Sequence, residues 1–333
     1  MVKNDNIVFE FREDMLAEFW DFITERHTIW RRRIIDKKVF PWTKDPILRK
    51  YHFCNVYREL DKGTIYPIKN ILEAPGMDFR VKLFNLLIYR LFNWPATSDE
   101  IGLIVDPEKF NYGHAIHRLI IRQLAGKRVF SNAYLGSGAG LDGGGKIKPY
   151  LLSMRDFALD SGWDGWKTVA GAVLITDSME KAWYLIQTVK WFGKFIAYQV
   201  VLDLMIYNNR KGWTKWIDTD RWFLVGGGAK PGLEYMLKDI DKKFKRPPKR
   251  KQDGTVAPRK KGFYADVVYV AAIRKLTEMS VTELRKRKSE WLPYRVLNVH
   301  DIEFCCCEFR KYINLRRMEA GGPRRKIRYY ESK

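Results

Sequence analysis

The sequence has few cysteines, no long apolar run and a deficit of acidic residues. Only 4 of its 333 residues are Cys, and the adjacent three at 305–307 fit neither a disulfide framework nor a zinc-binding spacing. No apolar run approaches the ~20 residues that a helix needs to cross a bilayer. Residues 1–14 carry charges where a signal peptide needs an apolar stretch. We therefore expect a reduced, cytoplasmic protein without a membrane span.

The excess of basic residues is the strongest signal in the composition. Lys and Arg number 61 against 39 Asp and Glu, which gives a formal net charge of +22. An excess of this size usually faces a polyanion, so nucleic acid is the leading partner and an anionic membrane surface is second. A hydrophobic fraction of 46% and an aromatic fraction of 14% are ample for a packed core, which argues against a disordered chain.

Apolar residues recur at helical spacing along most of the chain. Helices are expected over residues 9–35, 78–92 and 178–190, and around 299–317. Another is expected in the second half of 39–61, where spacings of four and three would place Tyr51, Asn55 and Arg58 on one side of a helix. The predicted fold class is therefore mainly all-α.

The domain organisation is predicted as a single helical DNA-modifying domain over residues 1–333 with two lobes, approximately 1–125 and 126–333. Two stretches within this domain differ in composition from the rest. The segment 242–261 is rich in Lys and Pro and cannot bury enough apolar surface to fold alone, so we expect a mobile basic insertion. The residues 321–333 form a basic, aromatic tail.

A glycine-rich stretch at 136–146 meets most of the phosphate-binding P-loop pattern. The pattern needs Ser or Thr at the next position, where this chain has Ile147, and it needs a helix to begin where Pro149 follows. A nucleotide-hydrolysing loop is therefore disfavoured. Two interpretations stay open: a surface loop, or a flexible loop whose amides and Lys146 approach a DNA phosphate.

Residues 185–204 predict two apolar helices joined by a tight turn at Gly193. Glycine in such a turn lets backbone amides near a helix N-terminus approach a DNA phosphate, because no side chain blocks the way. Gly193 and Lys194 are therefore candidate DNA contacts. A helix-hairpin-helix turn usually has two glycines flanking an apolar residue, and here Trp191 stands in place of one. An ordinary pair of packed helices is the alternative.

Asp218 and Asp220 follow the hairpin in an Asp-Thr-Asp loop. Helix-hairpin-helix DNA glycosylases have an aspartate in a similar setting, beside the flipped nucleotide. The alternative is that both carboxylates cap a helix beginning at Arg221, itself a candidate DNA contact. Phe195 stands where glycosylases that also cleave the DNA strand have a lysine, so Schiff-base strand cleavage is disfavoured.

Six segments together resemble the helical enzymes of bacteriophage thymine hypermodification. These are the α-glutamyl/putrescinyl thymine pyrophosphorylases or amino acid:DNA transferases, which are related to the helical domain of some hydroxymethyluracil DNA kinases. The segments are RHTIWRRRI (26–34), PWTKDPIL (41–48), YHFCNVYRELDKGT (51–64), FGKFIAYQVVLDL (192–204), DTDRWFLVGGGAKPGL (218–233) and DIEFCCCEFRKY (301–312). The resemblance implies a DNA-glycosylase-like helix-hairpin-helix architecture with basic loop insertions. Gly227 and Gly228 depart from the glycine-proline pair that the family often shows there.

The resemblance also implies a reaction on DNA that contains pyrophosphorylated hydroxymethyluracil. The base would be flipped from the stack, its pyrophosphate displaced, and an amino acid or polyamine attached to the base methylene. Asp218 or Asp220 is the candidate catalytic base. The candidate substrate-binding residues are His27, Arg33, Asn55, Arg58, Asp61, Glu303, Glu308 and Lys311, and the candidate DNA contacts are Lys146, Gly193, Lys194 and Arg221.

No metal and no organic cofactor is expected, and a structural monovalent cation at the Gly193 hairpin is left open. Two other functions stay open. One is a monofunctional DNA glycosylase that releases modified pyrimidines. The other is a non-catalytic DNA-binding partner of a hydroxymethyluracil DNA kinase.

Overall fold

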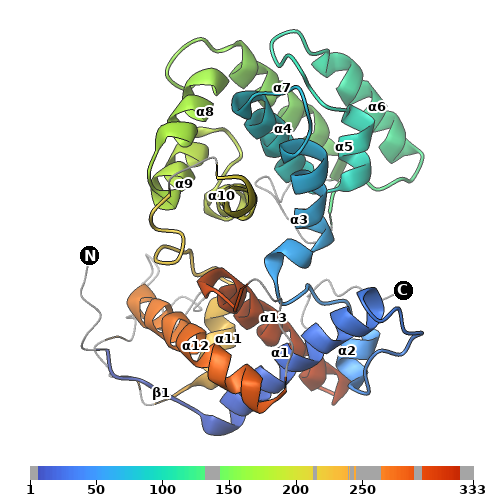
Figure 1. Ribbon diagram of the computed structural model, residues 1–333. Helices are drawn as coiled ribbons and strands as arrows, with labels where there is room; N and C mark the ends of the chain where they lie inside the picture. Colours follow the sequence, from blue (N-terminus) through green and yellow to red (C-terminus); the bar gives the residue numbers. More distant parts are fainter. Residues whose placement is uncertain are drawn as a thin grey trace, which may run out of the picture. The chain divides into compact units, whose positions relative to one another are not determined.

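The computed structural model describes residues 7–131, 143–212, 216–238, 240, 244, 264–288 and 295–322, and these are mainly helical, with two short strands (Figure 1). The predicted mainly α-helical fold class is therefore confirmed. The elements in chain order are β1 (Glu10–Phe11), α1 (Glu13–Ile34), α2 (Pro46–Lys50), the 3-10 turn η1 (Arg58–Leu60), α3 (Lys62–Pro67), the π-helical η2 (Ile68–Leu72), α4 (Phe79–Phe92), α5 (Pro95–Ile101), α6 (Tyr112–Leu124), the 3-10 turn η3 (Gly143–Lys146), α7 (Ile147–Leu159), α8 (Trp166–Ile175), α9 (Met179–Thr188), α10 (Lys194–Lys211), α11 (Ala229–Met236), β2 (Leu237–Lys238), α12 (Asp266–Lys286) and α13 (Val299–Glu319).

The chain folds into two compact units that are not consecutive in sequence. Unit 1 combines residues 1–58 with 223–333, and unit 2 is the uninterrupted stretch 59–222. The boundaries therefore fall at 58 and 222 rather than at 125, because α1 packs against α11, α12 and α13 from the other end of the chain. The strands β1 and β2 join the same two ends, with Glu10 opposite Lys238 in an antiparallel pair.

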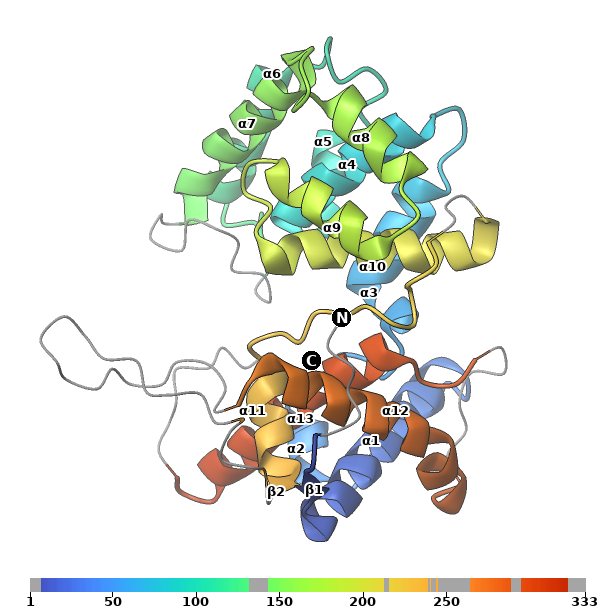
Figure 2. The ribbon, with the colours of Figure 1, turned by 90° about the vertical axis from the view of Figure 1, so that its left-hand side faces the viewer.

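The core of unit 1 depends on a close crossing of α11 and α13 (Figure 2). A Cβ atom at Gly232 would lie 2.0 Å from the Cys306 carbonyl oxygen, and one at Gly228 would lie 2.3 Å from the Cys307 Sγ atom. Only glycine allows the two backbones to approach this closely. The glycines at 228 and 232 and the cysteines at 306 and 307 therefore lie on the two sides of one helix contact.

The predicted apolar face of α1 is confirmed, and it packs on α13. Phe19 and Phe22 are buried against Phe309, with ring centroids 5.3 Å and 5.5 Å apart. The Asn298 side chain caps α13 by accepting hydrogen bonds from two backbone amides of its first turn. The Asn298 amide in turn donates to the Asp301 carboxylate, which completes a capping box.

The predicted helix across 51–58 is wrong. The helix α2 ends at Lys50, and Tyr51 is already extended, with φ −112° and ψ 142°. Side chains from α1 and α13 supply the backbone partners that a helix would otherwise provide. The Arg26 guanidinium donates to the Cys54 carbonyl at 3.1 Å, and the Cys54 amide donates to Glu308 at 3.0 Å. The segment 51–58 therefore lies as an extended strap between these helices.

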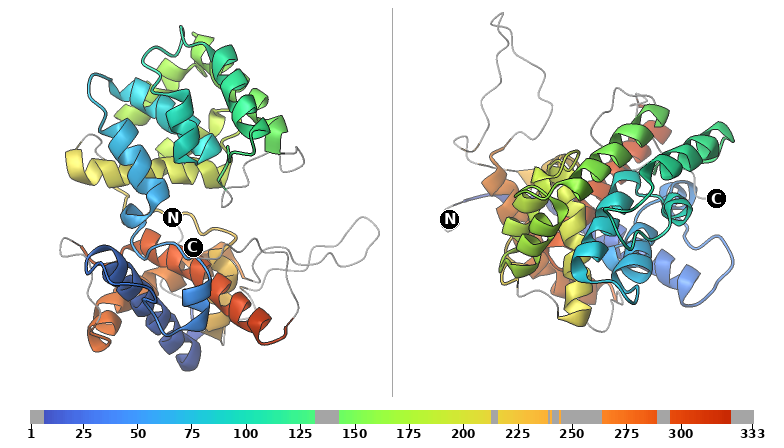
Figure 3. Two further views of the ribbon diagram at one scale, coloured as in Figure 1. Left: turned by 90° about the vertical axis from the view of Figure 1, so that its right-hand side faces the viewer. Right: turned by 90° about the horizontal axis from the view of Figure 1, so that it is seen from above.

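Unit 2 is built around α4, which contacts α5, α7, α8 and α10 (Figure 3). The sequence predicted this nearly continuous apolar helix, and Asp78 caps it by accepting a hydrogen bond from the Val81 amide at 3.0 Å. Inside it, Arg90 forms a fully buried two-pronged ion pair with Asp203 of α10, and its Nε donates to the carboxylate at 2.6 Å. This pair fixes α4 against α10.

The predicted helical hairpin of α9 and α10 is confirmed at the level of its helices and turn. Gly193 is the residue that precedes α10, and the turn is closed by a hydrogen bond from the Phe192 amide to the Val189 carbonyl at 3.0 Å. Trp191, which replaces the expected glycine, has a φ of +77°. This left-handed conformation costs a residue with a side chain about 1–2 kcal/mol relative to glycine.

The glycine-rich loop is described only from 143 onward, where η3 leads directly into α7. The expectation that Pro149 prevents a helix from beginning here is wrong, since α7 starts at Ile147 and its first turn includes Pro149. Proline is tolerated in a first turn because its missing amide hydrogen has no partner there anyway. The basic insertion 242–261 lies outside the described residues except for Phe244, and so does the tail beyond Gly322.

Candidate functional site

Four of the segments that carry the family resemblance meet around α13 in unit 1. The helix α1 contributes Arg26 and His27, and the strap contributes its backbone and Arg58. The loop 223–228 before α11 contributes Gly226, and α13 itself contributes Glu303. These segments are far apart in the sequence, so their convergence marks the strongest candidate site among the described residues.

Glu303 has the most unusual environment in this cluster. Its side chain is 8% exposed, and its Oε1 atom accepts a hydrogen bond from the Gly226 amide at 2.9 Å. Burial raises the pKa of Glu303 from 4.5 to about 7, an effect that the Gly226 hydrogen bond and the Arg58 charge offset only in part. A carboxyl group with this pKa exists in both protonation states at neutral pH, as a general acid or base requires.

Arg58 supplies a buried positive charge beside this carboxyl group. Its guanidinium lies over the ring of Phe304 with the carbon 4.2 Å from the ring centroid, and its backbone amide donates to Asp301 at 3.3 Å. Asp301 is itself held by an ion pair with Arg295. The carboxylate of Asp301 thus anchors the end of the strap and positions Arg58.

His27 is held between two aromatic rings. Its ring stacks on Trp30 with centroids 5.4 Å apart and meets the edge of Tyr57 at 5.2 Å. Burial, followed by the positive charges of Arg31 and Arg26, lowers the pKa of His27 to about 4. The imidazole is therefore neutral at physiological pH. Among the described atoms, its buried Nδ1 has no hydrogen-bond partner.

The other candidate residues of unit 1 are in the strap, on the α13 face that holds it, or at the end of α1. Glu308 accepts from the Cys54 amide, and the Lys311 ammonium donates to the His52 carbonyl and lies 3.9 Å from Glu308. Both side chains therefore hold the strap. Asn55 is half-buried within the strap, and Arg33 lies at the exposed end of α1.

The three adjacent cysteines are not reactive groups in this arrangement. Burial raises the pKa of Cys305 and of Cys307 to about 12, and that of Cys306 well above its usual value. A thiol with so high a pKa is a poor nucleophile at neutral pH. Cys306 and Cys307 lie in the helix contact with α11, whereas the Cys305 thiol faces Arg26 and the Val56 carbonyl.

The two candidate catalytic aspartates belong to unit 2. Asp218 caps α9: its carboxylate accepts from the Ser178 hydroxyl at 2.7 Å and from the Met179 and Glu180 amides at 2.6 Å and 3.2 Å. The alternative prediction, that Asp218 caps a helix, is therefore confirmed, but the helix is α9 and not one that begins at Arg221. In the described 216–228 stretch, residues 219–221 form a turn and no helix begins at Arg221. Asp220 is exposed.

The other unit 2 candidates differ in exposure. Gly193 and Lys194 are exposed at the start of α10, and Arg221 is exposed in the turn after Asp218. Lys146 is buried at the start of α7. Asp61 precedes α3 without a capping hydrogen bond from its side chain. The candidate residues thus fall into two groups, with His27, Arg33, Asn55, Arg58, Glu303, Glu308 and Lys311 in unit 1 and the others in unit 2.

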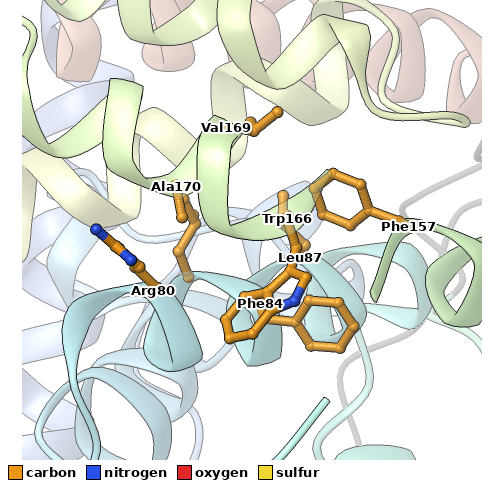
Figure 4. Close-up of a pocket in the computed structure, with 8 residues that line it drawn as sticks. Arg80, Phe84, Leu87, Phe157, Trp166, Val169 and Ala170 are labelled. Atoms are coloured by element: carbon orange, nitrogen blue, oxygen red, sulfur yellow. The ribbon is translucent and has the colours of Figure 1, made fainter. Parts of the chain in front are cut away.

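A hollow in unit 2 is less suited to a polar ligand (Figure 4). Its lining side chains leave no room even for a water molecule, whereas small-molecule sites typically enclose about 300–1,000 Å³. Arg80 is the only charged residue among the eight that line it, and Phe84 meets the edge of Trp166 there. Within the described ranges, no cluster of three or more His, Cys, Asp or Glu could hold a metal ion.

Several residues of the site were missed by the sequence predictions. Arg26 and Asp301 are almost fully buried and organise the strap, and Arg295 pairs with Asp301. Arg26 did carry a signal, because it lies one turn after Phe22 on the apolar face of α1, where a charged residue needs a partner. Arg295 and Gly226 carried none, since only the folded chain shows their neighbours.

Comparisons with known proteins agree with part of the sequence-based resemblance. The family described as "5-hmdU DNA kinase, helical domain" matches residues 13–322. The chain is 28% identical over 350 aligned residues to the 5-hmdU DNA kinase of Bacillus phage SP10, which covers 96% of this chain and 48% of that protein.

The chain thus spans about half the length of this curated relative. No solved structure matches, so the glycosylase-like architecture stays a prediction. In the described parts of the chain, no helix is long and apolar enough to cross a bilayer. The family match covers nearly every element of both units, and the chain therefore belongs to the helical-domain family of 5-hmdU DNA kinases.

Proposed function

We propose that this chain modifies hydroxymethyluracil in phage DNA by displacing pyrophosphate from a 5-pyrophosphoryloxymethyl-uracil base and attaching an amino acid or polyamine. The single observation that carries the proposal is Glu303, a buried carboxyl group with a pKa of about 7 beside the cation Arg58. This pair offers a proton acceptor for an incoming amine and a positive charge for a departing pyrophosphate.

The proposed reaction is a substitution at the base methylene carbon. The amine nitrogen attacks this carbon while the bond to the pyrophosphate oxygen breaks, and the electron pair leaves with the pyrophosphate. Ionised Glu303 then takes the proton from the newly attached nitrogen. Arg58 stabilises the negative charge that develops on the leaving group.

The test uses DNA that carries pyrophosphorylated hydroxymethyluracil, incubated with the full chain and a mixture of amino acids and polyamines. Nucleosides from the digested DNA are analysed by mass spectrometry. We expect a new nucleoside whose mass includes the amine, and a loss of at least about a hundredfold in its rate of formation for Glu303→Gln. Glu278→Gln, at an exposed position on α12, is the matched control and should keep the full rate. Unchanged nucleosides with every amine would refute the proposal.

The aspartates of the unit 2 loop stay alternative bases in this proposal. Asp218→Asn and Asp220→Asn are therefore compared with Glu303→Gln in the same assay. A loss confined to Asp220→Asn would move the role of base to that residue. A loss in Asp218→Asn is interpretable only beside a stability measurement, because its carboxylate also caps α9. Abasic sites in the treated DNA would instead favour a monofunctional glycosylase.

A second candidate function is that of a DNA-binding partner in the kinase reaction, without chemistry of its own. It is favoured by the description of the matching family as a helical domain of a kinase and by the chain's match to about half of the phage SP10 protein. In this case Glu303→Gln keeps its affinity for DNA. A hydroxymethyluracil DNA kinase then phosphorylates its DNA equally well beside the unchanged chain and beside Glu303→Gln. Equal kinase activity with and without the chain would exclude this candidate.

A further inference from the structure

The segment 31–44, which joins the end of α1 to α2, combines exposed apolar side chains with a dense set of cations. It contains six basic residues and one acidic residue, Asp36. Val39 is 89% exposed and Phe40 is 52% exposed, although apolar side chains of this size normally contribute to a core. Figure 1 shows this loop in blue between α1 and α2. An apolar patch rimmed by charges is typical of an interaction surface.

The loop is held in a defined shape, so the exposure of these side chains follows from its structure. The indole nitrogen of Trp42 donates to the Lys38 carbonyl at 2.7 Å, and Arg32 donates to the Trp42 carbonyl at 2.6 Å. The ring of Phe40 meets Trp42 edge-on with centroids 5.3 Å apart, and the Arg33 guanidinium covers the indole at 5.4 Å. Trp42 thus braces the loop from within and leaves Phe40 at its surface.

We propose that this loop binds an unpaired stretch of DNA, stacking a base on Phe40 while Lys37, Lys38 and Arg33 contact the flanking phosphates. Aromatic rings interspersed with cations are the means by which proteins hold single strands without reading their sequence. The commitment to DNA rests on the proposed function, and on the positive charge around the apolar patch. A base taken out of a duplex leaves such an unpaired stretch, so this contact would serve a reaction on a flipped base.

The test measures binding of the full chain to a fluorescent single-stranded oligonucleotide by anisotropy, and to vesicles of anionic lipid by flotation. Phe40→Ala should raise the Kd for the oligonucleotide at least about fivefold, and Phe40→Tyr, which keeps a ring, should restore the affinity. Trp163→Ala removes an aromatic side chain that is 90% exposed elsewhere and is the matched control. An oligonucleotide containing 2-aminopurine should lose fluorescence on binding to the unchanged protein and to Phe40→Tyr, and keep more of it with Phe40→Ala.

The cations are tested by salt dependence. The double variant Lys37→Gln/Lys38→Gln should lower the slope of log affinity against log salt by about 1.4, because each phosphate contact on a single strand contributes about 0.7. The control is the double variant Arg285→Gln/Lys288→Gln, which removes the same charge at exposed positions of α12 and the turn after it. It also matches the backbone strain, because Lys37 and Lys288 both have a left-handed backbone, with φ of 49° and 52°.

The outcomes separate this proposal from the proposed function. Equal affinity and equal 2-aminopurine fluorescence for Phe40→Ala and the unchanged protein would overturn the loop contact alone. Binding to vesicles but not to oligonucleotides would overturn it in favour of a membrane surface. Failure to form a modified nucleoside, with the expected effects on binding, would overturn the proposed function and support the loop contact.

Discussion

Replacing Glu303 by Gln should stabilise unit 1 above neutral pH while it removes activity. The pKa of Glu303 rises from 4.5 to about 7 on folding, a difference of about 2.5 units. At about 1.36 kcal/mol per unit, this corresponds to about 3 kcal/mol. Below pH 4.5 the carboxyl group is protonated in both states and contributes no difference. Stability is lost as the pH rises from 4.5 through 7, because only the unfolded chain ionises freely in this range.

Glutamine resembles the protonated carboxyl group in shape, and its amide oxygen can still accept the hydrogen bond from the Gly226 amide. The variant should therefore nearly match the unchanged protein at pH 4 and exceed it by up to about 3 kcal/mol at pH 8. Hydrogen exchange of the amides of α13 measures this at the right place, with Glu278→Gln as the control. Equal protection at both pH values, or a loss of protection that does not depend on pH, would refute the assigned environment of Glu303.

Three further changes test the packing of the two units by urea denaturation. Asp203→Asn should destabilise unit 2 by about 3–5 kcal/mol, since it leaves Arg90 buried without its counter-charge, and adding Arg90→Met should recover part of the loss. Gly232→Ala should lower the free energy of unfolding of unit 1 by about 1–3 kcal/mol, because its Cβ would meet a backbone oxygen of α13. Gly227→Ala, with open space around it, should be tolerated. Trp191→Gly should be about 1–2 kcal/mol more stable than Trp191→Ala, because both lose the ring and glycine alone adopts the left-handed turn without strain; equal stability would contradict this.

The helices of this fold could be predicted from the sequence wherever one apolar face is continuous. The face of α1 and the nearly uniform apolar run of α4 both gave correct elements, and Gly193 marked the correct turn. The strap at 51–58 could not be predicted in this way. Its aromatic and polar residues recur at helical spacing, yet partners from α1 and α13 satisfy its backbone. Local patterns carry no information about such distant partners.

The candidate site shows the same division. Glu303 and Arg58 lie in segments that resemble a family, and spacing alone does not predict that they converge in unit 1. The raised pKa of Glu303 depends on its burial beside Gly226 and Arg58 in the folded chain. The position of Asp218 after the hairpin predicts a role beside a nucleotide, whereas only the folded chain shows that its carboxylate caps α9. Sequence patterns identify residue types, whereas solvation and partners arise only when the chain folds.

The division of the chain at residues 58 and 222 has a consequence for synthesis on the ribosome. Residues 59–222 form one uninterrupted unit, so all of unit 2 has been synthesised before α11 and α13 are made. The apolar face of α1 and the strap must wait through this interval without their final partners, which favours binding by chaperones. A chain that stops before α13 can complete unit 2, but it lacks Glu303 and the helix around which the candidate site is built. The synthesis of α13 is thus the step that brings the candidate site together.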